Sequence, residues 1–312
     1  MDLSIITVSY NTRALLEKAL GSVFEGLARS DLEGEVWVVD NASTDGSAQM
    51  VRERFPRVRL IAHDQNVGFA AGNNLALRAL PRDAALRSRH VLFLNPDTRV
   101  LGDALGEMVR FLDAHPRAGA AGARLLHADG TFQHSAFAFP GLAQILIDFF
   151  PIHPRLVESR LNGRYPGRLY DARRPFPIDH PLGAAFMVRD TVLAQVDGFD
   201  ERFFMYCEEI DLARRIRATG AEIYCVPTAE IVHHVGQSTR QFRDEMFVAL
   251  WRSRFLMFQK HESARFRWLA HKLVHAGLRA ETHRVLAAHR RGEISDEEMA
   301  RRLAAYREVA AL

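Results

Sequence analysis

The sequence predicts an α/β fold, a mixed but mostly parallel sheet flanked by helices, followed by a helical C-terminal extension. Short apolar runs alternate with segments of helical spacing through the first half of the 312-residue chain, which is the pattern of a sheet covered by helices. After Gln241 only helical spacing continues. Hydrophobic residues make up 48% of the chain and charged residues 25%, a globular composition that excludes a disordered or disulfide-stapled chain.

The expected elements of the first half follow from two spacing patterns. Four apolar runs, the first rich in β-branched residues, are expected strands. They cover residues 3–9, 35–40, 58–62 and 90–95. Segments whose apolar residues recur every three or four positions are expected helices. They cover residues 12–24, 47–55, 69–80 and 103–115. Near-continuous apolar strands that alternate with helices are typical of parallel strands buried on both faces.

The second half is less regular. Residues 139–180 are rich in Pro, Arg and aromatic side chains and have poor periodicity, so we expect an irregular excursion with one short helix at 142–150. Further strands and one helix are then expected, at 183–188, 209–219 (the helix), 223–226 and 230–232. We divide the chain into a domain of residues 1–243 and a basic helical extension of residues 244–312.

Polar side chains stand where the predicted parallel strands end. They are Ser9 and Asn11, Asp40, Asn66, and Asn95 with Asp97. The carboxyl ends of parallel strands meet at one edge of a sheet, where α/β proteins bind ligands, and oxygen ligands suit a hard divalent cation. Two plainer interpretations stay open: a capped turn at residues 40–47 and a strand terminator at residues 95–97.

Two common nucleotide-binding classes are disfavoured. A dinucleotide-binding enzyme needs glycines directly after the first strand, and the sequence there is Tyr10-Asn11-Thr12. A Walker A sequence is absent as well, which excludes a P-loop nucleotide hydrolase.

Acidic and imidazole side chains in the second half are candidates for chemistry. Glu208 and Glu209 open a predicted helix, where they either complement the helix dipole or supply a general base. His233 and His234 end a short predicted strand and are either metal ligands or ordinary polar histidines. The two cysteines lack the spacing of a zinc site, so we expect buried apolar side chains in a reducing cytoplasm.

Six motifs together resemble the inverting glycosyltransferases of family 2, which have the GT-A fold, a Rossmann-like nucleotide-diphospho-sugar transferase architecture. The resemblance extends from Leu3 to Thr239. Its carriers are TVSYN at 7–11, VDNASTDGS at 39–47, NVGFAAGNN at 66–74, LNPD at 94–97, GFDERFF at 198–204 and EEIDL at 208–212. Within the family the motifs are most similar to those of bacterial rhamnosyltransferases of cell-wall or surface-polysaccharide assembly.

The resemblance implies roles by position for the nucleotide site. The residues expected to contact the nucleotide-sugar donor are Val8, Ser9, Asn11, Asp40, Asn66, Asn95 and Asp97. Asn95-Pro96-Asp97 stands where the family has its DxD motif, so Asp97 is expected to bind Mg²⁺ or Mn²⁺ at the donor diphosphate. His233 corresponds to the histidine that completes this metal site, with His234 as the alternative.

The resemblance also implies the reaction. Glu209 takes the place of the catalytic aspartate and is expected to deprotonate the acceptor hydroxyl, with inversion at the anomeric carbon. The expected enzyme moves a sugar from dTDP-rhamnose or a UDP-sugar to a glycan or lipid-linked acceptor, which residues 139–180 are expected to face. The alternatives are a nucleotidyltransferase that makes sugar nucleotides and a non-catalytic sugar-nucleotide-binding protein.

The tail carries the positive charge of the chain. From Glu245 onward 13 Lys and Arg stand against 8 Asp and Glu, a net charge of +5, whereas the whole chain carries +3. Aromatic residues between Phe247 and Phe258 form one helical stripe that either packs on protein or lies in a membrane interface. No nucleic-acid-binding motif accompanies the charge, so the candidate partner is a membrane surface. We expect a cytoplasmic protein, peripheral on the inner face of the plasma membrane, in which oligomerisation stays open.

Overall fold

The computed structural model describes all residues except 82, 84–86, 152 and 235–242. It divides into two compact units. Unit 1 comprises residues 1–138, 165–204 and 208–238, and unit 2 comprises residues 139–164, 205–207 and 239–312. Thr239 and Gln241, which mark the end of the resemblance and the start of the helical pattern, lie outside the described residues.

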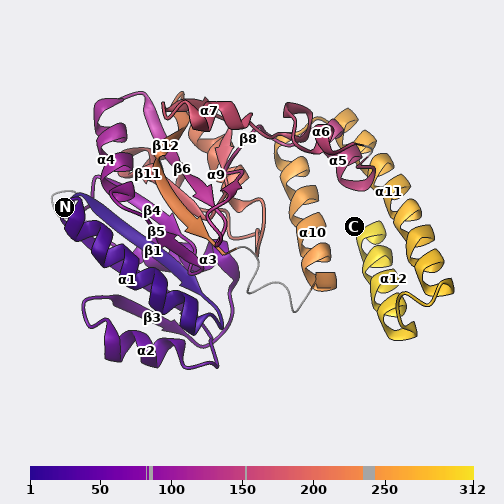
Figure 1. Cartoon of the computed structure of the whole chain (residues 1–312), viewed down its shortest axis with the longest axis horizontal. Coiled ribbons are helices and arrows are strands. Elements are labelled where there is room, and N and C mark those ends of the chain that lie inside the picture. The colour runs from indigo at the N-terminus through magenta and orange to yellow at the C-terminus, as the bar shows by residue number, and fades with distance from the viewer. Residues whose placement is uncertain (82, 84–86, 152, 235–242) are drawn as a thin grey trace. The chain divides into compact units, whose positions relative to one another are not determined.

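Unit 1 is built on a mixed sheet with the strand order β3-β2-β1-β4-β11-β6-β12-β5 (Figure 1). Its first four strands are parallel, as predicted, and include β1 (Leu3–Ser9), β2 (Gly34–Asn41), β3 (Arg59–His63) and β4 (His90–Leu94). Every residue of β1 and β4 is buried, because these strands are covered on both faces. The register places Ser9 beside Asp40, so the carboxyl ends of β1 and β2 coincide.

The rest of this sheet is mostly antiparallel. It contains β5 (Thr98–Val100), β6 (Ala118–Leu126), β7 (Phe132–Gln133), β9 (Phe176–Ile178), β11 (Ala185–Arg189) and β12 (Glu222–His233). β11 runs antiparallel between β4 and β6, and β12 pairs in parallel with β6 and antiparallel with β5. The segments 223–226 and 230–232, predicted as two strands, form one strand with a register shift between Val226 and Glu230. A separate small sheet pairs β8 (Ala136–Phe137) with β10 (His180–Pro181).

Strand β6 was not predicted, because its sequence AGAAGARLL lacks the β-branched residues that mark strands. The small side chains have a packing reason. A Cβ atom on Gly122 would lie 2.5 Å from Cβ of Pro181, and one on Gly119 would lie 2.6 Å from Cβ of Ala221. Neighbouring segments therefore approach the backbone of β6 more closely than a larger side chain permits.

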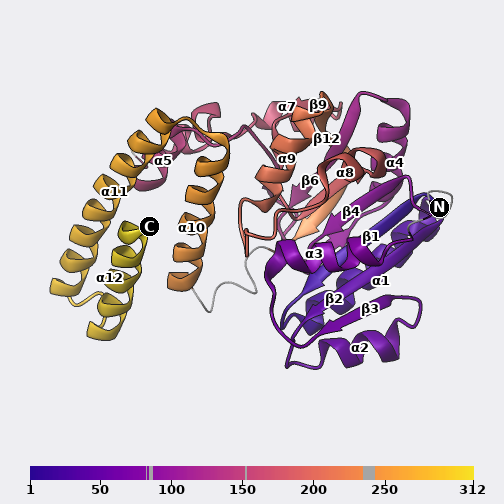
Figure 2. The ribbon, with the colours of Figure 1, turned by 180° about the vertical axis from the view of Figure 1, so that it is seen from behind.

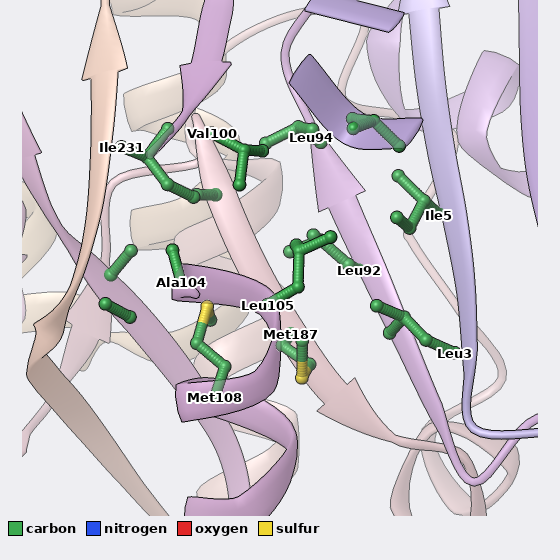
Figure 3. Close-up of a cluster of buried hydrophobic side chains, with 14 of the residues drawn as sticks. Leu3, Ile5, Leu92, Leu94, Val100, Ala104, Leu105, Met108, Met187 and Ile231 are labelled. Atoms are coloured by element: carbon green, nitrogen blue, oxygen red, sulfur yellow. The ribbon is translucent and has the colours of Figure 1, made fainter. Parts of the chain in front are cut away.

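Helices cover both faces of the sheet, as Figures 1 and 2 show. One face carries α1 (Arg13–Arg29) and α4 (Ala104–Ala114), with α2 (Ser47–Arg54) beside α1; the other carries α3 (Gly68–Ala79), α8 (Asp190–Val196) and α9 (Glu208–Ala218). Alternate residues of the strands serve the two faces. On the α4 side Leu3 and Ile5 pack with Leu92, Leu105 and Met108 in a fully buried cluster (Figure 3).

Unit 2 is helical. It contains α5 (Leu142–Phe149), α6 (Pro154–Val157), α10 (Arg243–His261), α11 (Ala264–Arg290) and α12 (Asp296–Ala311). The short helix predicted at 142–150 is confirmed, and it packs with the C-terminal helices, an association that the order of the chain does not indicate. In the described residues no helix is both long and apolar enough to cross a bilayer.

The aromatic stripe of α10 faces the interior of unit 2. Trp251 and Phe258 are almost completely buried, and Trp251 stacks on Phe149 of α5 with a centroid separation of 5.2 Å. Gly277 of α11 makes room for the Phe149 ring, with which any Cβ at that position would collide. Packing on protein therefore accounts for Trp251 and Phe258, and membrane contact by the rest of the tail stays a prediction.

Candidate active site

The ends of β1 and β2 carry the first group of predicted site residues. Val8 is buried against α3, where Gly72 allows the close approach: a Cβ on Gly72 would lie 2.9 Å from Cγ1 of Val8. Ser9 is buried, and its Oγ lies 2.9 Å from Oγ1 of Thr12, so the hydroxyl holds the start of α1. The parallel register of β1 with β2 sets Val8 opposite Val39 and Ser9 opposite Asp40.

Asn11 joins the loops that follow these two strands. Its backbone N–H donates to Oγ of Ser43 at 2.9 Å, and its Oδ1 accepts the backbone N–H of Thr44 at 2.8 Å. The residue has φ of 52°, a left-handed conformation that Asn tolerates better than most residues. In this structure Asn11 therefore shapes the edge of the predicted nucleotide site.

Asp40 has one carboxylate oxygen free for a ligand among the residues that the structure describes. Its side chain is buried, and Oδ2 accepts the backbone N–H of Ser43 at 3.2 Å. Oδ1 is buried and has no protein partner in the described part of the chain. A buried carboxylate oxygen without a hydrogen-bond partner costs free energy. A ligand hydroxyl or ring N–H that donates to Oδ1 would therefore bind more tightly.

Asn66 has a mainly structural set of contacts. Its Oδ1 accepts Nδ2–H of Asn41 at 2.8 Å and the backbone N–H of Gly68 at 3.0 Å. These bonds hold the turn that leads into α3. Its predicted contact with a donor nucleotide stays a prediction.

Asp97 and His233 lie side by side. The antiparallel pairing of β5 with β12 sets His233 opposite Thr98, and Nε2 of His233 lies 3.4 Å from Oδ1 of Asp97. Both side chains are about nine-tenths buried. His234 contributes through its backbone, whose N–H donates to the carbonyl of Asp97 at 2.9 Å. Of the two candidate histidines, His233 is the one whose ring reaches Asp97.

Gln133 of β7 touches the far side of the His233 ring, with Nε2 3.2 Å from Nδ1 of the histidine. Its Oε1 is buried and unpartnered among the described residues. The oxygen and nitrogen of an amide are told apart only by their hydrogen bonds. With the side-chain amide of Gln133 turned over, its Oε1 accepts Nδ1–H of His233. The lone pair of the other ring nitrogen, Nε2 of His233, then points toward Asp97.

This pair fits a divalent cation that is held partly by its substrate. Among the described residues no group of three or more His, Cys, Asp and Glu side chains gathers as a metal cluster. Mg²⁺ is commonly bound by one or two protein ligands, with water and substrate phosphates completing its shell. A histidine ligand whose second nitrogen is hydrogen-bonded to an oxygen, as Gln133 allows, is the usual arrangement.

Glu208 and Glu209 begin α9 after a strained turn. Tyr206 and Cys207 both have positive φ, 71° and 65°, a conformation that costs free energy in residues other than glycine and is frequent at functional sites. Glu208 is buried, and its Oε2 has no partner among the described residues. Glu209 is half-buried and is therefore the more accessible of the two.

Burial sets the proton affinity of this pair. Burial, together with the negative charge of Glu209, raises the pKa of Glu208 well above its usual value. Burial also raises the pKa of Glu209 to about 7, against the favourable backbone hydrogen bonds that lower it. Two carboxyl groups so placed release their protons in sequence. A pKa of about 7 places the ionisation of Glu209 near neutral pH, where a general base works best.

Two neighbouring contacts connect Glu209 to the end of β4. The backbone N–H of Asn95 donates to the carbonyl of Ala184 at 3.0 Å. Gly183 directly precedes Ala184, and a Cβ on Gly183 would lie 3.5 Å from both Cβ and Cγ of Glu209. The absence of a side chain at Gly183 leaves space beside the Glu209 carboxyl. The two contacts place Glu209 near the same sheet edge as Asp97.

Asn74 of α3 is a positioning residue that the sequence did not single out by itself. Its Oδ1 accepts the backbone N–H of Phe199, and its Nδ2 donates to the Phe199 carbonyl and to Oε1 of Glu201. Further along, the backbone N–H of Phe69 donates to the carbonyl of Phe204 at 2.8 Å. These bonds tie the motif at 198–204 to α3 and so fix the segment that leads to Glu208.

The chain matches known proteins along most of its length. A model of the family described as "Glycosyl transferase family 2" matches residues 4–196. The N-acetylglucosaminyl-diphospho-decaprenol L-rhamnosyltransferase of Mycobacterium tuberculosis is 29% identical over 306 residues, which cover 91% of this chain and 96% of the relative. Rhamnosyltransferase WbbL of Escherichia coli is 26% identical over 218 residues, 66% of this chain and 72% of the relative.

Solved structures support the fold. A mannosyltransferase from Pyrobaculum calidifontis, solved with GDP-Man and Mn²⁺, superposes with a TM-score of 0.57 at 20% identity over 99% of this chain and 86% of that one. TarS of S. aureus, solved with UDP-GlcNAc, superposes with a TM-score of 0.52 at 16% identity over 100% of this chain and 91% of that one. At these identities the likeness shows a shared fold, which confirms the predicted GT-A architecture.

Proposed function

The chain belongs to glycosyl transferase family 2 and is a glycosyltransferase, and we propose that it is a metal-dependent, inverting rhamnosyltransferase of cell-wall or surface-polysaccharide synthesis. The proposed donor is dTDP-rhamnose, with a UDP-sugar as the second candidate. The proposed acceptor is a hydroxyl of a lipid-linked glycan. Two relatives that are named rhamnosyltransferases support the sugar, and the name of the mycobacterial relative supports a lipid diphosphate acceptor.

The single observation that carries the proposal is the joint placement of Asp97, His233 and Glu209. The first two make a compact pair, with Nε2 of His233 3.4 Å from Oδ1 of Asp97. The third stands beyond Gly183, next to the end of β4. A donor diphosphate at the pair and an acceptor hydroxyl at Glu209 would both lie outside the carboxyl ends of the parallel strands.

The proposed mechanism is a single displacement. A divalent cation held by Asp97 and His233 would neutralise the charge that develops on the leaving diphosphate. Glu209 accepts the proton of the acceptor hydroxyl, whose oxygen attacks the anomeric carbon opposite to the breaking bond between the sugar and the diphosphate. One base and one displacement invert the anomeric configuration, and such a base contributes typically ~10²–10⁴-fold in rate.

We also propose that the protein works peripherally at the inner face of the plasma membrane. The net charge of +5 after residue 244 favours an anionic surface. No disulfide joins Cys207 and Cys225, which are both buried, as is typical of proteins in a reducing compartment.

A donor screen with a catalytic variant tests the function. In the presence of Mn²⁺, dTDP-rhamnose should raise the melting temperature of both the wild type and Glu209→Gln by mass action. Only the wild type should then transfer rhamnose to a lipid-linked acceptor. Binding without turnover by the wild type would favour a non-catalytic binder, and undiminished turnover by Glu209→Gln would reject the assignment of the base.

A further inference from the structure

Unit 2 contains a groove between α11 and α12 that none of the chemistry above uses. Its volume is about 570 Å³. The floor is apolar and includes Leu278 of α11 with Met299 and Leu303 of α12. A groove of this size with an apolar floor suits a hydrocarbon chain.

The rim of the groove is cationic. Arg279 and His283 stand on α11, and Arg307 stands on α12. Within the described part of the chain no ion pair joins Arg279 or Arg307 to a carboxylate; Nε of Arg307 donates only to the carbonyl of Leu303. The guanidinium groups are therefore available to an anion, and Arg binds phosphate oxygens in a bidentate manner.

The acids near the groove are neutralised by other arginines. Tyr306 lines the groove. Burial raises the pKa of its hydroxyl, and the negative charges of Glu281 and Asp244 raise it further, so both acids lie near the groove. Glu281 pairs with Arg284, and Asp244 lies 3.7 Å from Arg301. Helix α11 carries six Lys and Arg residues and a single acid. The lining of the groove contains Arg279 and Arg307 and no acid, so the groove presents a net positive charge.

The same face of α11 continues beyond the groove with exposed apolar side chains. Trp268 lies two turns before His275, a lining residue, and Leu286 lies one turn after Thr282, another lining residue. Trp268 is 60% exposed, with Nζ of Lys272 5.7 Å from its ring centroid, and Leu286 is 36% exposed. An exposed Trp beside cations is typical of a helix that lies in a lipid headgroup region.

We propose that this groove binds the diphosphate end of a polyprenyl diphosphate, the lipid carrier of the acceptor. The proposal rests on the proposed function for the identity of the lipid. Arg279 and Arg307 hold the two phosphates, and the first isoprene units lie on Leu278 and Leu303. A sugar nucleotide does not need the apolar floor, and inorganic diphosphate gains nothing from it. The combination selects an anion with a hydrocarbon tail.

Calorimetric titration with farnesyl diphosphate tests the proposal on the full chain. Excess chelator in every titration removes metal-dependent diphosphate binding at Asp97. Farnesyl diphosphate should bind at least tenfold more tightly than inorganic diphosphate, because only the former has a tail. Arg279→Glu should weaken farnesyl diphosphate binding about tenfold or more. The matched control is Arg155→Glu, an equal charge change at an exposed residue of α6 in the same unit, and it should change binding less than twofold.

Two results would overturn the groove assignment: equal affinity for farnesyl diphosphate and inorganic diphosphate, or equal weakening by Arg279→Glu and Arg155→Glu. Circular dichroism melts establish that both variants are folded, and Arg307→Gln provides a milder second variant expected to weaken binding in the same direction. The readout is independent of sugar transfer. If no nucleotide sugar is turned over but Arg279-dependent binding holds, the proposed function fails and the groove stands; the reverse result rejects the groove alone.

Discussion

Nε2 of His233 lies 3.4 Å from Oδ1 of Asp97, although the two residues are far apart in the sequence and belong to different segments of unit 1. The contact depends on β12 pairing antiparallel with β5, with His233 opposite Thr98. A shift of one residue in this register would turn the imidazole to the other face of the sheet. The sheet itself therefore builds the pair that we assign to the cation.

Loss of either member of this pair should weaken metal binding. Asp97→Asn and His233→Ala should each weaken Mn²⁺ binding in the presence of the donor nucleotide at least tenfold, because each removes one of two protein ligands. Electron paramagnetic resonance of free Mn²⁺ measures the affinity. Asp64→Asn, at an exposed acid after β3, is the control and should leave the affinity unchanged. Donor binding that persists in excess chelator would argue against the metal site.

Gln133 should act through the tautomer of His233. Gln133→Ala removes the acceptor for Nδ1–H and should weaken Mn²⁺ binding by about 10–100-fold, the usual effect of losing such a partner. Gln133→Glu keeps an oxygen at that position and should retain most of the affinity. Nitrogen NMR of labelled histidine reports the tautomer directly. Equal losses in the two variants would indicate a purely steric role for this residue.

Much of the sheet edge that carries the site could be predicted from the sequence. The local composition of the chain explains why Gln133 and β6 could not. Asp40 closes one apolar run and Asp97 follows another, so their positions at strand ends could be inferred from spacing. Gln133 could not, because its strand has two residues and leaves no periodic signal. Strand β6 could not be predicted, because close packing requires Ala and Gly at positions where strands usually have β-branched residues.

Tertiary association was also beyond the sequence. Residues 139–164 have poor periodicity, and nothing local indicates that they pack with the C-terminal helices of unit 2. The stripe from Phe247 to Phe258 had two consistent interpretations, since an amphipathic helix buries its apolar face equally well in protein or in lipid. Only the stacking of Trp251 on Phe149 distinguished them.

The rate of sugar transfer should depend on the ionisation of Glu209. Its pKa is about 7, and the base must be unprotonated to accept the acceptor proton. We therefore expect kcat/KM to fall about tenfold for each pH unit below 7 and to level off above it. Initial rates at saturating metal between pH 5.5 and 8.5 measure this. A profile that is flat across that range would contradict the raised pKa of the base.

The same carboxyl groups should make the protein less stable as pH rises. The pKa values of Glu208 and Glu209 are higher in the folded state than the usual 4.5, so the folded chain binds more protons than the unfolded chain above that pH. The free energy of unfolding then decreases with rising pH from about 4.5 to about 7 and beyond. Glu208→Gln should reduce the loss of melting temperature between pH 5 and pH 8, and Glu25→Gln, at an exposed residue of α1, should not.

Asp40 at the end of β2 and Asp45 in the loop that follows should respond differently to loss of charge. Oδ1 of Asp40 is buried without a partner in the described residues, so Asp40→Asn breaks no hydrogen bond at that oxygen and should not lower the melting temperature. The variant should still weaken donor binding about tenfold, since a ligand hydrogen bond to a charged group contributes ~1.5–3 kcal/mol.

Asp45 is the matched control, because its carboxylate is fully used within the protein. It accepts the backbone N–H of Arg13 at 2.8 Å and both the N–H and the hydroxyl of Ser47, and the Ser47 hydroxyl and these backbone donors outweigh burial and lower its pKa. Asp45→Asn should cost ~1–2 kcal/mol of stability. Urea unfolding and calorimetric titration with the donor separate the two effects. A stability loss in Asp40→Asn as large as that in Asp45→Asn would mean that Asp40 serves the loop and not the nucleotide.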